Sequence, residues 1–254
     1  MRAITRSIGP AYRDALGQDA GYAIDLALAE RQHAAYVATL RQLGVAVTVL
    51  PEGGFADGCF VEDTAIIIGG QALVTRPGAP SRRAETEAIA DALLTLGLHV
   101  TTMHEPALLD GGDVLRMANK LFVGRSARTN EAGIQQLAAW TAPLGHAVIV
   151  VDVPPATLHL KCHATAPVPG LLVRARHALP DSWVPNDWDT IDLPDAEAYA
   201  ANTLGIDQTI IIAAGYPETM KRIAATGRPV IALDTTEIAK AAGSLTCLSL
   251  LVES

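Results

Sequence analysis

The stretch Gln42-Leu43-Gly44-Val45-Ala46-Val47-Thr48-Val49-Leu50 decides the fold, because it joins the end of a helix directly to a β-strand. Its glycine is typical of the residue that ends a helix, and the β-branched residues after it favour a strand. The same pattern returns at Gly97, Gly145 and Gly227, each time before an apolar segment. A pattern that recurs roughly every 50 residues predicts a fold built from repeated units.

Pairs of short apolar segments lie between these repeats. They are residues 64–68 with 71–75, and residues 113–116 with 120–123. Two such segments around a short turn, the first with Gly69-Gly70, are typical of a β-hairpin. Each unit is therefore predicted to contain a hairpin, a helix and a strand.

Two further segments complete the count of units. The interval before the last repeat is longer, and residues 183–188 stand where a helix is expected, so one unit has lost its helix. Residues 246–252 are predicted to form a strand that pairs with residues 3–5, which places both chain ends in one unit. The chain then holds five units, and this period is typical of radial repetition. We predict an α/β fold in a single domain over residues 1–254.

Two helices can be placed from their apolar periodicity. Residues 24–43 have apolar side chains along one side, with Gln32 on the polar side. Residues 84–96 have a stripe that includes Leu93, with Ser81 as the expected N-cap. We expect each helix to cover the outside of a small sheet.

The composition sets the class of protein. The 254 residues are 50% hydrophobic and 18% charged, with a formal net charge of -8 at pH 7. A chain this apolar can bury enough surface to fold, which excludes disorder. The acidic balance argues against nucleic acid and anionic membranes as partners, and favours a cationic small molecule. Cys59, Cys162 and Cys247 have no CxxC spacing, and no apolar run reaches the roughly 20 residues of a membrane helix. We expect a cytoplasmic protein.

Four segments are polar where strand ends are expected to be apolar: residues 57–63, 109–114, 158–163 and 245–249. Each has an ordinary interpretation on its own. Acidic residues beside glycines are common in exposed turns, and a cysteine in an apolar strand is most often an inert core thiol. Together, however, they supply carboxylates, histidines and the Cys247 thiol, each at the edge of a different unit.

The third segment also raises the question of a metal. In an extended strand, His159, Lys161 and His163 would share one face. Two histidines are zinc ligands, but no further ligand is signalled in the sequence. We therefore expect no metal.

The sequence resembles the guanidino-group-modifying (pentein) superfamily, and most closely its dimethylarginine dimethylaminohydrolase family. The resemblance follows the family's order along nearly the whole chain. The matching residues are Phe60-Val61-Glu62-Asp63, Thr75 to Arg83, Leu109-Asp110-Gly111-Gly112-Asp113-Val114-Leu115, Phe122-Val123-Gly124 with Arg128-Thr129-Asn130, Leu158-His159-Leu160-Lys161 and Leu245-Thr246-Cys247. It implies a five-bladed α/β propeller of ββαβ repeats with pseudo-fivefold symmetry, in agreement with the count of units.

The resemblance also implies a catalytic group of three residues. Cys247 is the expected nucleophile, His159 the expected general acid and base, and Asp110 the carboxylate that orients the imidazole. The implied reaction is hydrolysis of Nω-methylated arginine to citrulline and a methylamine, without a cofactor.

Further residues are implied to bind the substrate. Asp63 is expected to accept hydrogen bonds from the guanidinium group, with Glu62 and Asp57 supporting the site or the polar end of the substrate. The remaining implied binding residues are Arg82 and Arg128 for the α-carboxylate, and Leu16 on a mobile lid loop whose movement Gly17 and Gly21 would permit.

Some residues depart from relatives. Lys161 stands where arginine deiminases carry an aspartate that grips the guanidinium group, and Ala241 and Ala242 leave the binding of the α-amino group open. Two alternatives follow: a guanidine hydrolase resembling arginine deiminase, or a non-catalytic protein that binds an arginine derivative. A homodimer is the oligomer that we consider.

Overall fold

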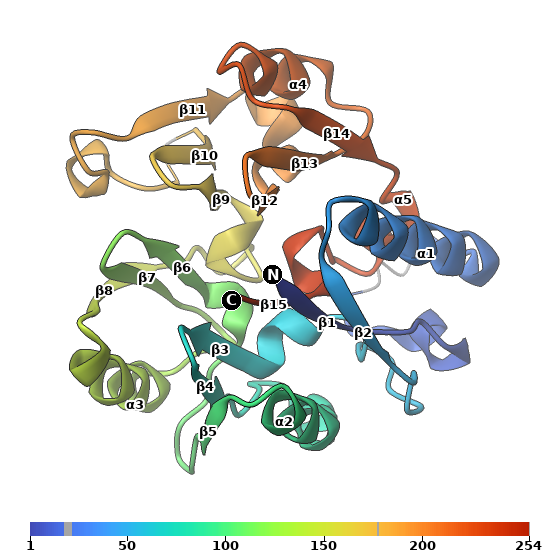
Figure 1. Ribbon diagram of the computed structural model, residues 1–254, viewed down its shortest axis with the longest axis vertical. Coiled ribbons are helices and arrows are strands. Elements are labelled where there is room, and N and C mark those ends of the chain that lie inside the picture. Colours follow the sequence, from blue (N-terminus) through green and yellow to red (C-terminus); the bar gives the residue numbers. More distant parts are fainter. Residues whose placement is uncertain (18–21, 177, 254) are drawn as a thin grey trace.

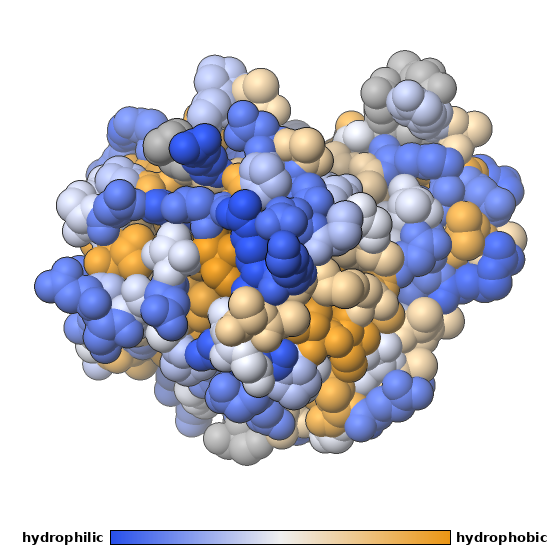
Figure 2. Space-filling model, turned by 90° about the horizontal axis from the view of Figure 1, so that it is seen from above, coloured by the Kyte–Doolittle hydropathy of each residue, from blue (hydrophilic) through white to orange (hydrophobic). Residues whose placement is uncertain are grey.

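The computed structural model describes residues 1–17, 22–176 and 178–253. In this part of the chain, five three-stranded sheets surround a common axis, like the blades of a propeller (Figure 1). The five-unit α/β fold is therefore confirmed. No helix among the described residues is long and apolar enough to cross a membrane. Polar side chains are spread over most of the face shown in Figure 2, with apolar groups between them.

Every sheet has the same topology. The inner strand is antiparallel to the middle strand, and the outer strand is parallel to it. From inside to outside, the first three sheets are β15 (Leu250–Val252), β1 (Arg2–Arg6) and β2 (Ala46–Leu50); β3 (Ala65–Ile68), β4 (Gln71–Val74) and β5 (His99–Thr102); and β6 (Val114–Met117), β7 (Lys120–Arg125) and β8 (Ala147–Asp152). The other two are β9 (Ala164–Val168), β10 (Leu171–Ala175) and β11 (Asp189–Leu193); and β12 (Leu204–Ile206), β13 (Thr209–Ala213) and β14 (Val230–Leu233).

The helices lie on the outside of the propeller (Figure 1). They are α1 (Leu26–Gln42), α2 (Thr86–Thr95), α3 (Glu131–Thr141) and α4 (Pro217–Ala224), followed by the short α5 (Thr236–Lys240). The fourth sheet has a 3-10 turn, Asp181–Trp183, in place of a helix. The predicted loss of one helix is confirmed.

Two details of the predicted helices are wrong. Gln32 was expected on the polar side of its helix, but it is buried. Its side chain donates to Thr236 Oγ1 at 2.7 Å and accepts from Glu237 N at 2.9 Å. These bonds fasten α1 to α5. Ser81 is not the N-cap of α2, because residues Pro80–Glu85 form a 3-10 helix that runs directly into it.

The segments around His159 and Cys247 are turns rather than strands. Leu160–Cys162 and Thr246–Leu248 are 3-10 helices, and the strands begin only after them. Similar turns, Val61–Thr64 and Gly111–Asp113, precede β3 and β6. Each tight turn lets the chain reverse onto an inner strand, so it brings the residues before that strand toward the axis.

The chain ends close the propeller. Residues Arg2, Ala3 and Ile4 of β1 pair with Val252, Leu251 and Leu250 of β15. The predicted pairing of the two ends is confirmed, although Thr5 is not part of it.

Removal of the Leu250 side chain is expected to weaken this closure. Leu250 is buried between the first and second sheets, whereas its neighbour Leu251 is half-buried. We expect Leu250→Ala to lower the free energy of unfolding by roughly 2–4 kcal/mol, measured by urea denaturation. Leu251→Ala serves as the matched control and is expected to cost less. Equal losses in the two variants would contradict the burial difference.

Candidate active site

The turns before the inner strands gather four reactive side chains near the axis. Asp63 lies in the turn before β3, and Asp110 begins the turn before β6. His159 begins the turn before β9, and Cys247 lies in the turn before β15. A repeated structural position thus brings together residues that are far apart in the sequence.

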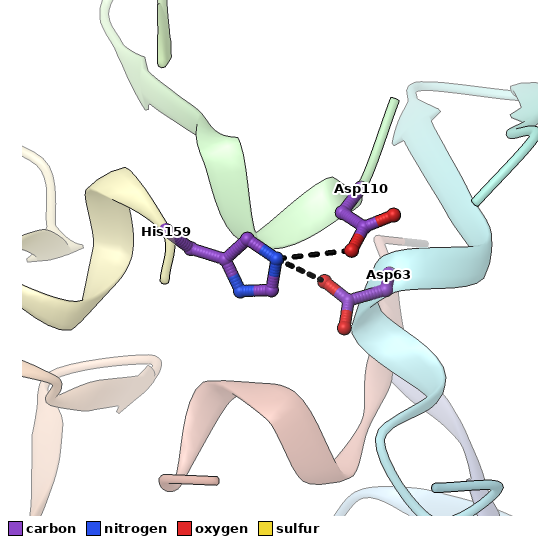
Figure 3. A group of neighbouring side chains, drawn as sticks. All are labelled: Asp63, Asp110 and His159. Atoms are coloured by element: carbon purple, nitrogen blue, oxygen red, sulfur yellow. Dashed lines mark hydrogen bonds and ion pairs between the residues drawn. The ribbon is translucent and has the colours of Figure 1, made fainter. Parts of the chain in front are cut away.

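His159 points between two carboxylates (Figure 3). Its Nε2 atom is 3.0 Å from Asp110 Oδ2 and 4.0 Å from Asp63 Oδ1. All three side chains are buried. Gly112 makes this approach possible, since a Cβ atom there would lie 2.6 Å from His159 Nδ1.

Asp63 is held by donors on both of its oxygens. Gly112 N donates to Oδ1 at 2.8 Å, and Arg82 Nη1 donates to Oδ2 at 2.6 Å. Burial alone would raise the pKa of Asp63, but the charges of His159 and Arg82 outweigh it and lower the pKa to about 2. Asp63 is therefore an anion throughout the physiological range.

The carboxylates determine the charge of His159. Burial alone would lower the pKa of the imidazole, but Asp63, followed by the hydrogen bond to Asp110, raises it to about 9. His159 is therefore an imidazolium at neutral pH. It can donate a proton to a leaving group without first being charged by the solvent.

Cys247 lines the pocket that His159, Asp63 and Arg128 also line. Burial raises the pKa of its thiol well above the usual value, and the charges of Glu62 and Asp63 raise it further. The cysteine is a thiol in this state. A cation bound beside it would favour the thiolate.

Glu62 belongs to a ring of polar groups behind Cys247. Its carboxylate accepts from Lys161 Nζ at 2.6 Å and from Thr246 Oγ1 at 2.8 Å. Asn202 Nδ2 donates to Lys161 O at 3.0 Å and to Thr246 Oγ1 at 2.9 Å, and Asn202 Oδ1 accepts from Thr246 N at 2.9 Å. The ring thus connects the turn that carries His159 to the turn that carries Cys247.

Asn202 and Asp113 are site residues that sequence reasoning missed. Asp113 accepts from Leu160 N at 3.0 Å, from Ser126 Oγ at 2.6 Å and from Thr129 Oγ1 at 2.7 Å, so it holds the turn after His159. The sequence could have indicated Asp113 as a site residue, because it ends the Asp-Gly-Gly-Asp segment that begins with Asp110. Asn202 has no local signal, because its partners are distant in the sequence.

Asp57 and Leu16 are also brought together. Both oxygens of Asp57 accept from the backbone N–H of Leu16, at 3.2 and 3.3 Å, and the Leu16 side chain is exposed. Gly17 lies against Ala241 and Ala242, where a Cβ atom on it would be 2.6 Å from Ala241 O. Gly21, the other expected lid glycine, lies outside the described residues.

The two arginines differ in their surroundings. Arg128 Nη1 lies 3.7 Å from Asp110 Oδ2, and its side chain is partly exposed. Arg82 is buried and donates to Asp63, to Glu85 at 2.9 Å and to Phe60 O at 2.9 Å. Most N–H groups of Arg82 therefore donate to other residues of the protein. Its expected contact with a substrate carboxylate stays a prediction.

Asp63, Asp110 and His159 form a cluster whose ligand atoms all lie within 4.8 Å of one another, the only such group in the described part of the chain. The Arg82–Asp63 ion pair opposes metal binding there, because Arg82 already neutralises the Asp63 carboxylate. His163 is not part of the cluster, and its Nε2 atom is hydrogen-bonded to Thr157 Oγ1 at 2.9 Å. The expected absence of a metal stays a prediction.

Five three-stranded blades, four of them with a helix before the outer strand, with a cysteine, a histidine and acidic groups at their axis define a guanidino-group-modifying propeller. Residues 8–162 match the family model described as "N,N dimethylarginine dimethylhydrolase, eukaryotic". The chain is 39% identical to the N(G),N(G)-dimethylarginine dimethylaminohydrolase of Streptomyces coelicolor, over 89% of this chain and 86% of the relative. It is 35% identical to the Pseudomonas aeruginosa enzyme over 89% of both chains. The chain belongs to the dimethylarginine dimethylaminohydrolase family.

Solved structures agree with this assignment. A cysteine-to-serine mutant of the Pseudomonas aeruginosa enzyme, complexed with citrulline, matches with a TM-score of 0.91 at 33% identity, over 98% of both chains. A histidine-to-glycine variant of a dimethylarginine dimethylaminohydrolase, in an adduct with S-methyl-L-thiocitrulline, matches equally well. The N-terminal domain of a cyanobacterial arginine dihydrolase, 18% identical with a TM-score of 0.87, shares the fold.

The raised pKa of His159 can be tested without a substrate. In Asp110→Asn, we expect the titration midpoint of the imidazole to fall from about 9 toward its ordinary value, measured by NMR of the ring nitrogens. Because the folded pKa is raised, the stabilisation from Asp110 is complete below the unfolded pKa and is lost as the pH rises through about 9. The stability difference between wild type and variant should shrink over that range. Asp152→Asn, at an exposed carboxylate, is the control. An unchanged midpoint in Asp110→Asn would contradict the assignment.

Proposed function

We propose that this protein hydrolyses Nω-methylated arginines, namely asymmetric dimethylarginine and monomethylarginine, to citrulline and dimethylamine or methylamine. The observation that carries the proposal is the position of the His159 ring, held between Asp63 and Asp110 in the pocket that Cys247 lines. Membership of the family supports the same reaction.

Substrate binding starts the chemistry. The guanidinium group carries a permanent cation, and Asp63 offers the anion that orients it beside Cys247. The cation also opposes the negative charges that keep the thiol protonated, so it favours the thiolate at the moment when the nucleophile is needed. The sulfur then attacks the guanidino carbon.

His159 serves both halves of the reaction. As an imidazolium, it gives its proton to the leaving methylamine, which leaves a covalent adduct on Cys247. The neutral imidazole then takes a proton from the water that attacks the adduct. Asp110 keeps the ring in place and stabilises its charged form, as the carboxylate does in other catalytic triads.

The amino-acid end of the substrate faces the outer part of the pocket. Arg128 is the main partner that we assign to the α-carboxylate, with the remaining Nη1 donor of Arg82 beside it. Asp57 lines the pocket and accepts from the backbone N–H of Leu16, so it holds this part of the chain beside the pocket. Glu62 supports the site through Lys161 and Thr246 rather than by facing the substrate.

Lys161 argues against an arginine deiminase-like reaction. Its ammonium group is paired with Glu62, so this position provides no second carboxylate for an unsubstituted guanidinium group. A non-catalytic binding protein would not require Cys247 and a charged His159 in one pocket.

Three further assignments belong to this proposal. The reaction needs no cofactor, since the nucleophile, the acid and the base all come from the chain. The cytoplasm suits an enzyme whose described cysteines are all unpaired. A homodimer stays a prediction.

The reaction is tested by offering asymmetric dimethylarginine, monomethylarginine and arginine to the purified protein in parallel. We expect citrulline release from the two methylated compounds and none from arginine. Cys247→Ser, which removes the nucleophile, is expected to abolish turnover and to leave the circular dichroism spectrum unchanged. Turnover of arginine alone would instead assign the deiminase reaction.

Asn202 is expected to position the catalytic turns. Asn202→Leu keeps the size of the side chain but removes the bonds to Lys161 and Thr246. We expect kcat to fall by about tenfold or more, with a much smaller change in KM, because the reacting groups shift relative to each other. Asn119→Leu, at an exposed turn, is the control and should leave kcat unchanged. A wild-type kcat in Asn202→Leu would remove this role.

A further inference from the structure

The blade of β12, β13 and β14 differs from the other four at the position that carries their reactive residues. In those four blades, a reactive residue lies in or just before the turn that leads into the inner strand: Asp63, Asp110, His159 and Cys247. In this blade, the 3-10 turns Asp195–Ala201 precede the inner strand β12. They supply none of the four reactive side chains.

This segment instead fastens the chain that leads into Cys247, and it does so at two points. Asn202, the residue after the 3-10 turns, accepts from Thr246 N at 2.9 Å. Tyr199, within the turns, donates from its hydroxyl to Gly243 O at 3.0 Å. Both bonds cross from one blade to the next. The backbone on the N-terminal side of the nucleophile is therefore held by a neighbouring blade.

Gly243 is confined from another direction as well. A Cβ atom on Gly243 would lie 2.2 Å from Phe60 Cε1, so its backbone lies directly against the aromatic ring. Its N–H donates to Ile238 O at 3.0 Å. Gly243 and Phe60 both line the pocket that Cys247 lines. The Tyr199 hydroxyl therefore bonds to the backbone of the pocket wall itself.

The Tyr199 hydroxyl is a fixed donor. Burial raises the pKa of this phenol to about 12, so it keeps its proton at neutral pH. A carbonyl oxygen can only accept a hydrogen bond, so the phenol proton is directed at Gly243 O. The ring packs against that of Tyr216, with the centroids 5.7 Å apart.

One peptide group connects this donor to the nucleophile. The C=O of Gly243 and the N–H of Ser244 belong to the same planar unit. Burial raises the pKa of the Cys247 thiol, and the backbone N–H of Ser244 acts in the opposite direction. Hydrogen bonds in a chain polarise one another, so the bond from Tyr199 to the C=O makes the N–H a stronger donor to the sulfur.

We propose that Tyr199 is a positioning residue for the nucleophile Cys247. It acts through the peptide between Gly243 and Ser244, which it holds in place and polarises. The inference rests on the proposed function for the role of Cys247, and it adds a residue to that function. The substrate cation favours the thiolate only while it is bound, whereas this peptide is in place in the free enzyme. One blade thus supports the nucleophile rather than supplying a reacting group.

The test removes the hydroxyl and keeps the ring, in Tyr199→Phe. The probe is chloroacetamidine, a cationic reagent whose chloride is displaced by a thiolate, and mass spectrometry locates the alkylated cysteine. We expect alkylation of Cys247 near pH 7 to slow about three- to tenfold, as the loss of one hydrogen bond would give. The pH profile of the rate should move upward by about half a pH unit or more. With a methylarginine as substrate, kcat should fall by a similar factor while KM changes little.

Tyr216→Phe is the matched control. It removes the same hydroxyl from the neighbouring ring, at the start of α4, and should behave as wild type. Circular dichroism verifies the fold of each variant. A wild-type alkylation rate in Tyr199→Phe would overturn the proposal. An equal loss of rate at every pH, or a loss confined to KM, would also overturn it, because altered packing alone gives these results.

The alkylation experiment is independent of turnover. If wild type and Tyr199→Phe differ in alkylation as expected, but the wild type releases no citrulline from any methylarginine, the proposed function fails and the role of Tyr199 beside Cys247 stands.

Discussion

The buried ion pair between Arg82 and Asp63 is the interaction on which the site depends. The charges of His159 and Arg82 keep the pKa of Asp63 low, so this carboxylate is ionised in a place where burial alone would favour its neutral form. The anion in turn keeps His159 protonated, against the same effect of burial. A chain of charges therefore prepares the acid before a substrate arrives, and the cost of burying each charge is offset by its neighbour. A neutral residue at any of these positions would leave the buried charge of its partner without an opposite charge beside it.

The propeller makes this chain of charges possible because it repeats one geometry. Each catalytic residue lies in or just before a tight turn that leads into an inner strand. Symmetry then directs these turns toward one axis, although the residues come from different blades. The pairing of β1 with β15 closes the circle and fixes the blade that carries Cys247 relative to the others. The closure of the propeller and the positions of the catalytic residues therefore depend on the same strand pairing.

The sequence predicted more of the fold than of the site. Glycines such as Gly44 end helices by a local rule, so the repeats and the missing helix were predictable. The segments at His159 and Cys247 were predicted as strands from their apolar residues. They are turns, because the apolar pattern does not mark the residue at which the inner strand begins. The role of Asn202 arises only from partners brought together by the fold. Arg82 resembles a substrate-binding residue in sequence, yet its ion pairs became visible only in three dimensions.

The same axis has two different ends. On one side, Gly17 lies against Ala241 and Ala242, and the bond between Leu16 and Asp57 lies nearby, so the pocket is narrow, with a volume of about 20 Å³. On the other, residues of the five inner strands line a cavity of about 930 Å³. The tight pocket keeps bulk water away from the charges around His159, which strengthens the interactions that hold its imidazole protonated. The ion pair of Glu62 and Lys161 lines the larger cavity, while Asp63 and His159, their close neighbours in the sequence, line the pocket, so the two spaces share the turns that carry the catalytic residues.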